Sequence, residues 1–397
     1  MTGEHERGER TGTLGPQATF ERRVLGALEA SPSRIPVVLG GCGTGRTAML
    51  RRLRDRLGPG AVQYVDVEHC ATTPERFLEA VVASSPFRSA ERSYTASNAR
   101  TAFEQFLTYL DATRAPGGEP ATFLLDEALD LKTFESFPGL RHVLRDLVRA
   151  LAASPNRFVL STRYATRARW LLRDAGPRFE VMQVPPLSAI EVADVLAPAM
   201  NGYEQVATED RDFLARAVLA ITDGRPAYVK AVGEALGTQR GRTADPVSAL
   251  VQQMVTGGAI DRLCRFSYEL RLQRARGYGA LKAILDILAT EEPLTLTEIS
   301  QRLHRTPGST KDYLSWLEDV DLITSVHKRY SFTDPVLRLW VRVHCRPVPP
   351  TEEQVAEDVQ RFALGKLPRT DTAPTLAYVG ADATAEERRS WGIIEID

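Results

Sequence analysis

A glycine-rich run near the N-terminus constrains the fold of this 397-residue chain more than any other feature. An apolar segment, 35–40, precedes the run, and a segment with helical periodicity, 47–57, follows it. A strand that turns through glycines into a helix is typical of a parallel α/β sheet. The run itself reads Gly40-Gly41-Cys42-Gly43-Thr44-Gly45-Arg46-Thr47.

Four further apolar runs have the length and residue types of strands buried on both faces. They cover residues 61–67, 121–126, 157–162 and 179–184. Most are far enough apart for a crossover helix, and two helices are expected at 74–83 and 99–110. The sequence therefore predicts an α/β domain over 20–188 with a parallel five-stranded sheet.

Other patterns divide the rest of the chain. Helical periodicity without strands predicts an all-helical lid over 189–276. Residues 277–346 follow the order of three helices and a β-hairpin, which is typical of a winged helix-turn-helix domain. We expect a disordered lead-in over 1–19 and a C-terminal helix and tail over 347–397.

Composition limits the classes of function. Lys and Arg (50) balance Asp and Glu (51), so a nucleic-acid surface would have to be local. Four cysteines without paired spacing argue against a disulfide framework or a zinc site and fit a reducing compartment. We find no signal peptide and no apolar run of the roughly 18 to 20 residues that a membrane span needs. A soluble, cytoplasmic protein is expected.

The glycine run has the chemistry of a phosphate cradle, or P-loop. Backbone N–H groups turn inward around a phosphate where glycines leave room, and the following helix presents its N-terminus to the anion. We expect all eight residues of 40–47 to bind ATP, and the hydroxyl of Thr47 to bind Mg²⁺ as well. The alternative is a glycine-rich turn without a ligand.

Arg46 departs from the usual pattern, in which a lysine reaches the β- and γ-phosphates. Arginine carries the same charge on a bulkier planar fork, so the exchange need not be conservative. We expect ATP binding to tolerate Arg46 better than fast hydrolysis does. This chain uses far more arginine than lysine throughout, which is a simpler explanation for part of the difference.

Two further strand ends carry candidate catalytic residues. Asp126 and Glu127 follow the strand 121–126, where an aspartate can hold Mg²⁺ and a glutamate can activate the attacking water. Arg163 closes the strand 157–162, at the sheet edge where α/β folds bind ligands, and is a candidate sensor of the γ-phosphate. The alternative for Arg163 is an arginine that only caps the strand end or pairs with a surface acid.

These segments resemble the AAA+ and STAND branch of P-loop ATPases, and within it the archaeal-type ATPases and origin-recognition-like initiators that end in a winged helix. The resemblance implies that one strand separates the P-loop strand from the strand that ends in Asp126. It also implies that Pro226, in the Gly-x-Pro motif of the lid, lies near the nucleotide base. The matching segments are GGCGTGRT (40–47), FLLDE (123–127), FVLSTR (158–163), VPPLS (184–188), DGRP (223–226) and YSFTDP (330–335).

The expected winged helix offers basic residues for DNA. Arg305 and Lys311 lie near the start of the candidate recognition helix, 309–318, and Lys328 and Arg329 lie at the expected hairpin tip. Acidic residues occur in the same region, and winged helices in the resembling group often contact proteins. Contact with double-stranded DNA and contact with a protein therefore remain equal alternatives.

The leading hypothesis is an ATP-binding molecular switch that hydrolyses ATP slowly and couples its ATP or ADP state to DNA or to a partner protein. One alternative is a non-hydrolysing, nucleotide-bound adaptor that recruits a partner through the winged helix or the tail. Another is a DNA-binding regulator with a vestigial P-loop. Self-association into a homo-oligomer is compatible with all three, whereas a membrane is not expected among the partners.

Overall fold

The computed structural model describes residues 15–87, 94, 96–200, 208–238, 244–273, 275 and 277–367. Most of the predicted lead-in and the tail from residue 368 onward lie outside these residues. One prediction about the lead-in is wrong, because helix α1 (Pro16–Glu29) begins before residue 19. Pro16 at its first position fits a helix start, since proline lacks the N–H that would be unsatisfied there.

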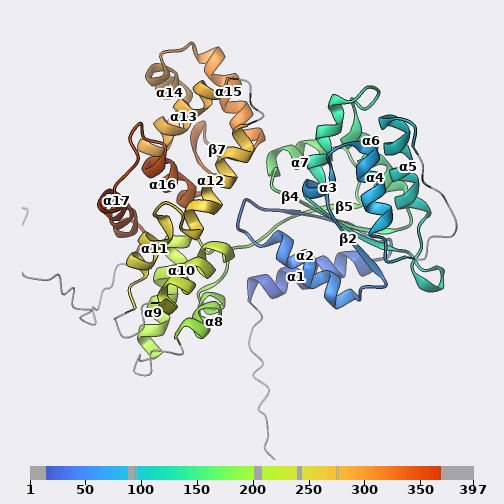
Figure 1. Ribbon diagram of the computed structural model, residues 1–397, viewed down its shortest axis with the longest axis horizontal. Helices are drawn as coiled ribbons and strands as arrows, with labels where there is room; N and C mark the ends of the chain where they lie inside the picture. Colours follow the sequence, from blue (N-terminus) through green and yellow to red (C-terminus); the bar gives the residue numbers. More distant parts are fainter. Residues whose placement is uncertain are drawn as a thin grey trace, which may run out of the picture.

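The N-terminal half is a parallel sheet with helices on both faces (Figure 1). The sheet order is β2-β3-β4-β1-β5, with every neighbouring pair parallel. β4 lies between β1 and β3, which confirms the strand order that the resemblance implies. The strands are β1 (Ile35–Leu39), β2 (Val62–Asp66), β3 (Thr122–Asp126), β4 (Arg157–Thr162) and β5 (Phe179–Gln183).

Successive side chains of the central strands point to opposite faces and pack into two cores. On one face, Val38 and Leu124 join the buried side chains of α1 and of α2 (Arg46–Leu57). On the other face, Phe123 packs with the helices between β2 and β4. These are α3 (Val67–Cys70), α4 (Pro74–Ala83), α5 (Ala99–Ala112) and α6 (Val143–Ala153), with the 3-10 segments η1 (Pro116–Gly118) and η2 (Ala128–Ser136).

Between β4 and β5 lies α7 (Ala165–Leu172), and a helical region follows β5. Within this region, Asp223 and Gly224 adopt positive φ and Pro226 starts the next helix, so the DGRP segment ends one helix and begins another. The helices are α8 (Ala189–Met200), α9 (Thr208–Thr222), α10 (Pro226–Thr238), α11 (Pro246–Met254) and α12 (Ala259–Leu272).

Residues 278–344, which we call the hairpin unit, contain the expected three helices and β-hairpin, together with a short strand and a last helix that were not expected. Its three strands form an antiparallel sheet in the order β6-β8-β7. The two tip residues, His327 and Lys328, both have positive φ, as a tight two-residue hairpin turn requires. The elements are α13 (Tyr278–Thr290), β6 (Leu294–Thr295), α14 (Leu296–Leu303), α15 (Pro307–Asp319), β7 (Ile323–Val326), β8 (Arg329–Phe332) and α16 (Pro335–His344).

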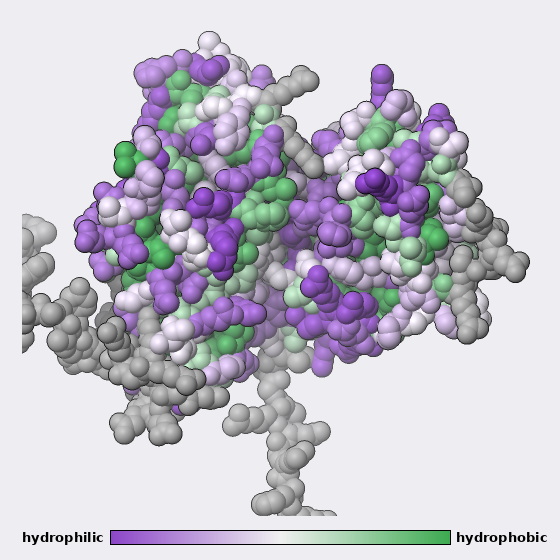
Figure 2. Space-filling view, viewed as in Figure 1, coloured by the Kyte–Doolittle hydropathy of each residue, from purple (hydrophilic) through white to green (hydrophobic). Residues whose placement is uncertain are grey.

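A last helix, α17 (Glu352–Leu364), packs against α11 and α16. In Figure 1 the sheet forms one lobe, and α8 to α17 form the other. Figure 2 shows hydrophilic residues gathered over α1 and α2, where the side chains of Arg51 and Arg52 are exposed. Within the described residues, no helix is both long and apolar enough to span a bilayer.

Candidate nucleotide-binding site

The glycine run connects β1 to α2 as a tight loop. Gly43 and Gly45 have φ values of 77° and 88°, a left-handed conformation that side chains other than glycine rarely adopt. Gly45 is the N-cap of α2 and offers no side-chain cap, so the first backbone N–H groups of the helix point into the loop. This arrangement leaves those donors available to an anion.

Arg46 turns back into the loop and forms a buried ion pair with Glu127. The Arg46 and Glu127 residues are 7% and 6% exposed. Arg46 Nη1 also donates to the carbonyl oxygen of Gly41 at 2.9 Å. The arginine at the usual lysine position therefore holds the candidate catalytic glutamate and the loop together.

Glu127 is held from a second side by Arg163. The backbone N–H of Arg163 donates to Glu127 Oε2 at 3.0 Å, and its Nε lies 3.2 Å from the same oxygen. Burial alone would raise the pKa of Glu127, but the two guanidinium groups outweigh it and hold the pKa below its usual range. Glu127 also has a φ of 53°, which is uncommon outside glycine and is typical of strained functional positions.

Arg163 itself faces three acids. Its Nη2 contacts Glu68 and lies 3.5 Å from Asp130 Oδ2, in addition to the contact with Glu127. Arg163 itself is 6% exposed, whereas the side chain of its partner Glu68 is 35% exposed. The guanidinium lies inside the site rather than on the surface.

Asp126 is fixed by two hydroxyl groups. The Tyr64 hydroxyl donates to Asp126 Oδ2 at 2.8 Å, and the Ser161 hydroxyl donates to Oδ1. Ser161 Oγ in turn accepts from the backbone N–H of Glu127 at 3.1 Å. Burial, assisted by Asp126, raises the pKa of Tyr64 above the ordinary phenol range. The tyrosine therefore remains a donor that orients the carboxylate.

The DGRP segment brings the helical region onto the loop. Arg225 Nη1 donates to the carbonyl oxygen of Cys42 at 3.1 Å, and a Cβ on Gly41 would lie 2.9 Å from the same nitrogen. The backbone N–H of Ala227 donates to the carbonyl oxygen of Gly43 at 3.1 Å. Pro226 packs beside Gly45, with its Cγ 3.5 Å from the position of a Cβ there. Pro226 thus contacts the loop directly.

The hairpin unit reaches the same place. Asp334 Oδ2 lies 3.0 Å from Arg225 Nη1 and accepts from the Tyr228 hydroxyl at 2.9 Å. Arg225 Nη2 donates to the carbonyl oxygen of Thr333 at 3.0 Å. Arg225 therefore joins the P-loop and the hairpin unit through one guanidinium group.

A cavity of about 360 Å³ opens between these elements. Its walls include Gly40 and Thr44 of the loop, Arg163 of the β4 end, Pro226 of the helical region and Thr333 of the hairpin unit. The sheet edge, the helical region and the hairpin unit thus enclose one space at the mouth of the loop.

No family model matches the chain, and no curated protein does either. Among solved structures, the Walker-type ATPase PABY2304 of Pyrococcus abyssi is similar over 82% of this chain and 95% of that chain, with 17% identity and a TM-score of 0.58. The chain shares the fold of this Walker-type ATPase.

Two other structures match at lower TM-scores. Orc1 of Aeropyrum pernix, in complex with DNA, covers 88% of this chain and 95% of its own, with 17% identity and a TM-score of 0.40. A point variant of RuvB from Thermotoga maritima covers 80% and 92%, with 13% identity and a TM-score of 0.40. The likeness in fold rests on the archaeal ATPase.

In this P-loop ATPase fold, the predicted nucleotide and catalytic residues gather at one sheet edge, whereas the predicted DNA residues lie elsewhere. Arg305, Lys311, Lys328 and Arg329 are exposed on the hairpin unit. Arg329 Nη1 donates to the carbonyl oxygen of Pro293 at 3.2 Å. These four residues make none of the contacts described above at the loop.

Sequence reasoning missed several residues of the site. Tyr64 lies in β2, Glu68 lies on α3, and Asp334 is the N-cap of α16. Arg225 stands inside the DGRP motif, so its position between Gly224 and Pro226 was an available signal. The others are separated from their partners by long stretches of chain, and only the sheet order brings them together.

Proposed function

We propose that the protein is an ATP-binding switch that hydrolyses ATP slowly and couples its nucleotide state to the position of the hairpin unit. The observation that carries this proposal is the ion pair of Arg46 with Glu127 inside a P-loop. The same arginine that would reach the phosphates neutralises the residue that would activate water.

The loop residues 40–47 would hold the phosphates through backbone N–H groups at the N-terminus of α2. Thr47 and Asp126 supply hydroxyl and carboxylate oxygens, the donors that Mg²⁺ prefers, and Asp126 is oriented by Tyr64 and Ser161. Bound Mg²⁺ would neutralise charge on the phosphates.

Slow turnover follows from the electrostatics of Glu127. A general base works best when its pKa lies near the working pH. Two buried guanidinium groups lower the pKa of Glu127, and each lies against one of its oxygens. Hydrolysis would require Arg46 to leave Glu127. A nucleotide phosphate in the loop would compete with Glu127 for the Arg46 guanidinium group.

Coupling to the hairpin unit runs through Arg225, which contacts Cys42 in the loop and Asp334 beyond it. A phosphate at the loop would compete with Asp334 for the guanidinium, so the two nucleotide states would favour different hairpin positions. We infer that the hairpin unit is a winged helix that changes its contacts with DNA or with a protein.

A nucleotide-bound adaptor without turnover is the second candidate, and the same buried pair of Arg46 and Glu127 favours it. It predicts tight ATP or ADP binding and no hydrolysis, even after Arg46→Lys. A DNA-binding regulator with a vestigial P-loop predicts instead that DNA affinity does not change with nucleotide.

Nucleotide binding itself can be tested with two matched glycine variants at the ends of α2. Gly45 and Gly58 have positive φ values of 88° and 91°, with ψ of 13° and 137°, so an alanine should strain the backbone at each by about 1 kcal/mol or more. Only Gly45 lies in the loop. In calorimetric titration with Mg-ATP, we expect Gly45→Ala to lose at least tenfold in affinity and Gly58→Ala to match the wild type. Equal affinity in both variants would refute the site.

A further inference from the structure

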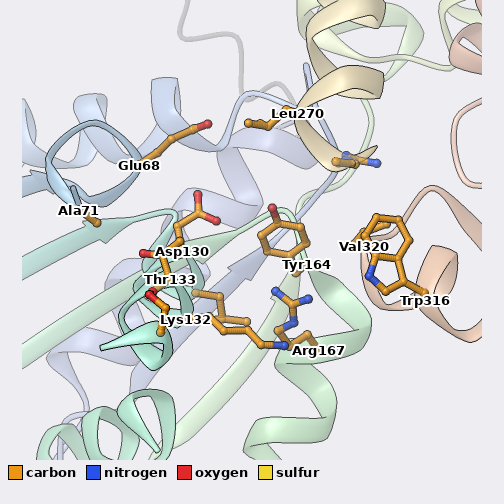
Figure 3. Close-up of a pocket in the computed structure, with 13 residues that line it drawn as sticks. Glu68, Ala71, Asp130, Lys132, Thr133, Tyr164, Arg167, Leu270, Trp316 and Val320 are labelled. Carbon is orange, nitrogen blue, oxygen red and sulfur yellow. The ribbon is translucent and has the colours of Figure 1, made fainter. Parts of the chain in front are cut away.

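A second cavity, of about 560 Å³, lies between the P-loop ATPase domain and the rest of the molecule. Its walls come from α3, η2 and α7 on one side and from α12 and α15 on the other. In Figure 3, Tyr164 lies between Asp130 and Trp316, so aromatic and charged side chains share the space. No residue of the glycine run lines this cavity.

Arg271 on α12 is the unusual member of the lining. It is 5% exposed, and its Nη1 donates to the backbone carbonyl oxygen of Asp321 at 2.8 Å. Its Nε has no hydrogen-bond partner, and within the described part of the chain no carboxylate lies within ion-pair distance of it, although the Asp321 carboxylate acts on it from farther away. Burial lowers the pKa of Arg271. A buried cation without a paired counter-charge is costly, and a bound anion would offset that cost.

The neighbours of Arg271 add positive charge. Arg167 also lines the cavity, is paired with Asp319, and has an Nε without a partner. Lys132 lines the opposite wall. The acids of the lining, in contrast, already face another cation, because Glu68 and Asp130 both lie against Arg163.

We propose that this cavity binds a phosphate-type oxyanion through the guanidinium group of Arg271. A guanidinium fork matches the oxygens of a phosphate group, and the further cations of the lining suit an ion of more than one negative charge. Tyr164 and Trp316 offer apolar faces to the remainder of a phosphorylated molecule. The anion would also bridge the ATPase domain and α12, where Arg271 lies.

Two sources have this chemistry. One is a separate phosphorylated ligand, for which the cavity would be a second site. The other is the terminal phosphate of a nucleotide on the P-loop, which rests on the proposed function. Asp321, whose backbone carbonyl oxygen accepts from Arg271, also lines the cavity at the mouth of the loop, so the guanidinium lies next to the space for the nucleotide.

The first measurement saturates the protein with Mg-ADP and titrates it with inorganic pyrophosphate. A separate ligand predicts one further site, whose affinity falls at least tenfold in Arg271→Met. Arg262→Met, an exposed position on the same helix, is the control and should bind as the wild type does.

The second measurement compares ATP with ADP. If the terminal phosphate is the source, Arg271→Met lowers the affinity for ATP at least tenfold and leaves the affinity for ADP unchanged. A folded Arg271→Met that changes neither pyrophosphate binding nor the preference for ATP overturns the proposal.

A third measurement needs no variant of Arg271. Trp316 lines the cavity, so a saturable change in tryptophan fluorescence should accompany binding of pyrophosphate or ATP to the wild type, and Trp316→Phe should lose it. A wild type that shows no such change with either ligand also overturns the proposal.

Discussion

The ion pair between Arg46 and Glu127 predicts a large and specific loss of stability when Glu127 is replaced by glutamine. The two side chains are 8% and 7% exposed, so removing the charge of Glu127 leaves a guanidinium buried without its partner. Breaking a buried pair in this way costs about 3 to 5 kcal/mol. The amide oxygen of glutamine can still accept a hydrogen bond, so we expect about 3 kcal/mol, the lower end of that range.

Urea unfolding gives the free energy of unfolding directly, and Glu68→Gln is the matched control. Glu68 also pairs with Arg163, but its side chain is 35% exposed, and a partly exposed pair contributes about 1 kcal/mol or less. If Glu127→Gln costs no more than Glu68→Gln, the buried pair does not hold the site together as described.

The pH dependence of stability tests the same prediction independently. Because the folded pKa of Glu127 lies below the usual value of 4.5, its ionisation stabilises the fold above that value, and this contribution is lost as the pH falls through the folded pKa. As the pH falls below 5, the free energy of unfolding of the wild type should therefore decrease more than that of Glu127→Gln. Parallel pH profiles for the two proteins would refute the reasoning.

Three further predictions concern the contacts of the hairpin unit. Asp321 accepts hydrogen bonds from Thr166, at the start of α7, at 3.2 to 3.3 Å, and burial raises the pKa of Asp321 to about 6. The contact between α7 and the hairpin unit therefore favours the protonated acid, and it should weaken as the pH rises through 6. Hydrogen exchange at the start of α7, corrected for intrinsic rates, should then increase, and Asp321→Asn should remove this pH dependence; an unchanged dependence would contradict it. Asp334→Asn should weaken the contact with Arg225 and increase hydrogen exchange in the hairpin unit, whereas unchanged exchange would argue against coupling through that contact. If the hairpin unit binds DNA, replacing both Lys311 and Arg329 with alanine should lower the affinity for duplex DNA in a fluorescence anisotropy titration. The salt dependence of binding should fall by about two phosphate contacts. An unchanged salt dependence would show that these residues do not contact phosphates.

The strands and the loop were predictable because their signals are local. Each strand is a short apolar run bounded by turns, and the glycine run has the spacing of a phosphate cradle. The start of α1 was also signalled, by Pro16 after Gly15, yet the polar composition around it suggested disorder. Composition was a weaker guide there than the single proline.

The partner of Arg46 was not predictable because 81 residues separate it from Glu127. Their contact depends on β4 lying between β1 and β3, and on the left-handed backbone at Glu127. Sequence alone indicated that Arg46 was unusual. Only the fold shows that its guanidinium group pairs with the acid on which turnover would depend.

The contact of α7 with the hairpin unit leaves only a weak signal in the sequence. Tyr164 at the N-cap of α7 makes no capping hydrogen bond, so the first turn of the helix lacks a local acceptor. Asp321 supplies that acceptor from the hairpin unit, 155 residues away. A helix start without a capping residue can therefore point to a contact with another part of the chain, although not to which one.

The central claim is that Arg46 permits ATP binding while it restrains hydrolysis through Glu127. The most direct test measures single-turnover and steady-state ATP hydrolysis in three proteins: the wild type, Arg46→Lys, and the double variant Arg46→Lys, Glu127→Gln. A lysine lacks the planar fork that contacts Gly41 and Glu127 together. We expect Arg46→Lys to bind ATP as the wild type does and to hydrolyse it at least tenfold faster, and we expect the added Glu127→Gln to abolish that gain. If Arg46→Lys binds ATP normally but turns it over no faster than the wild type, the restraint does not come from this ion pair.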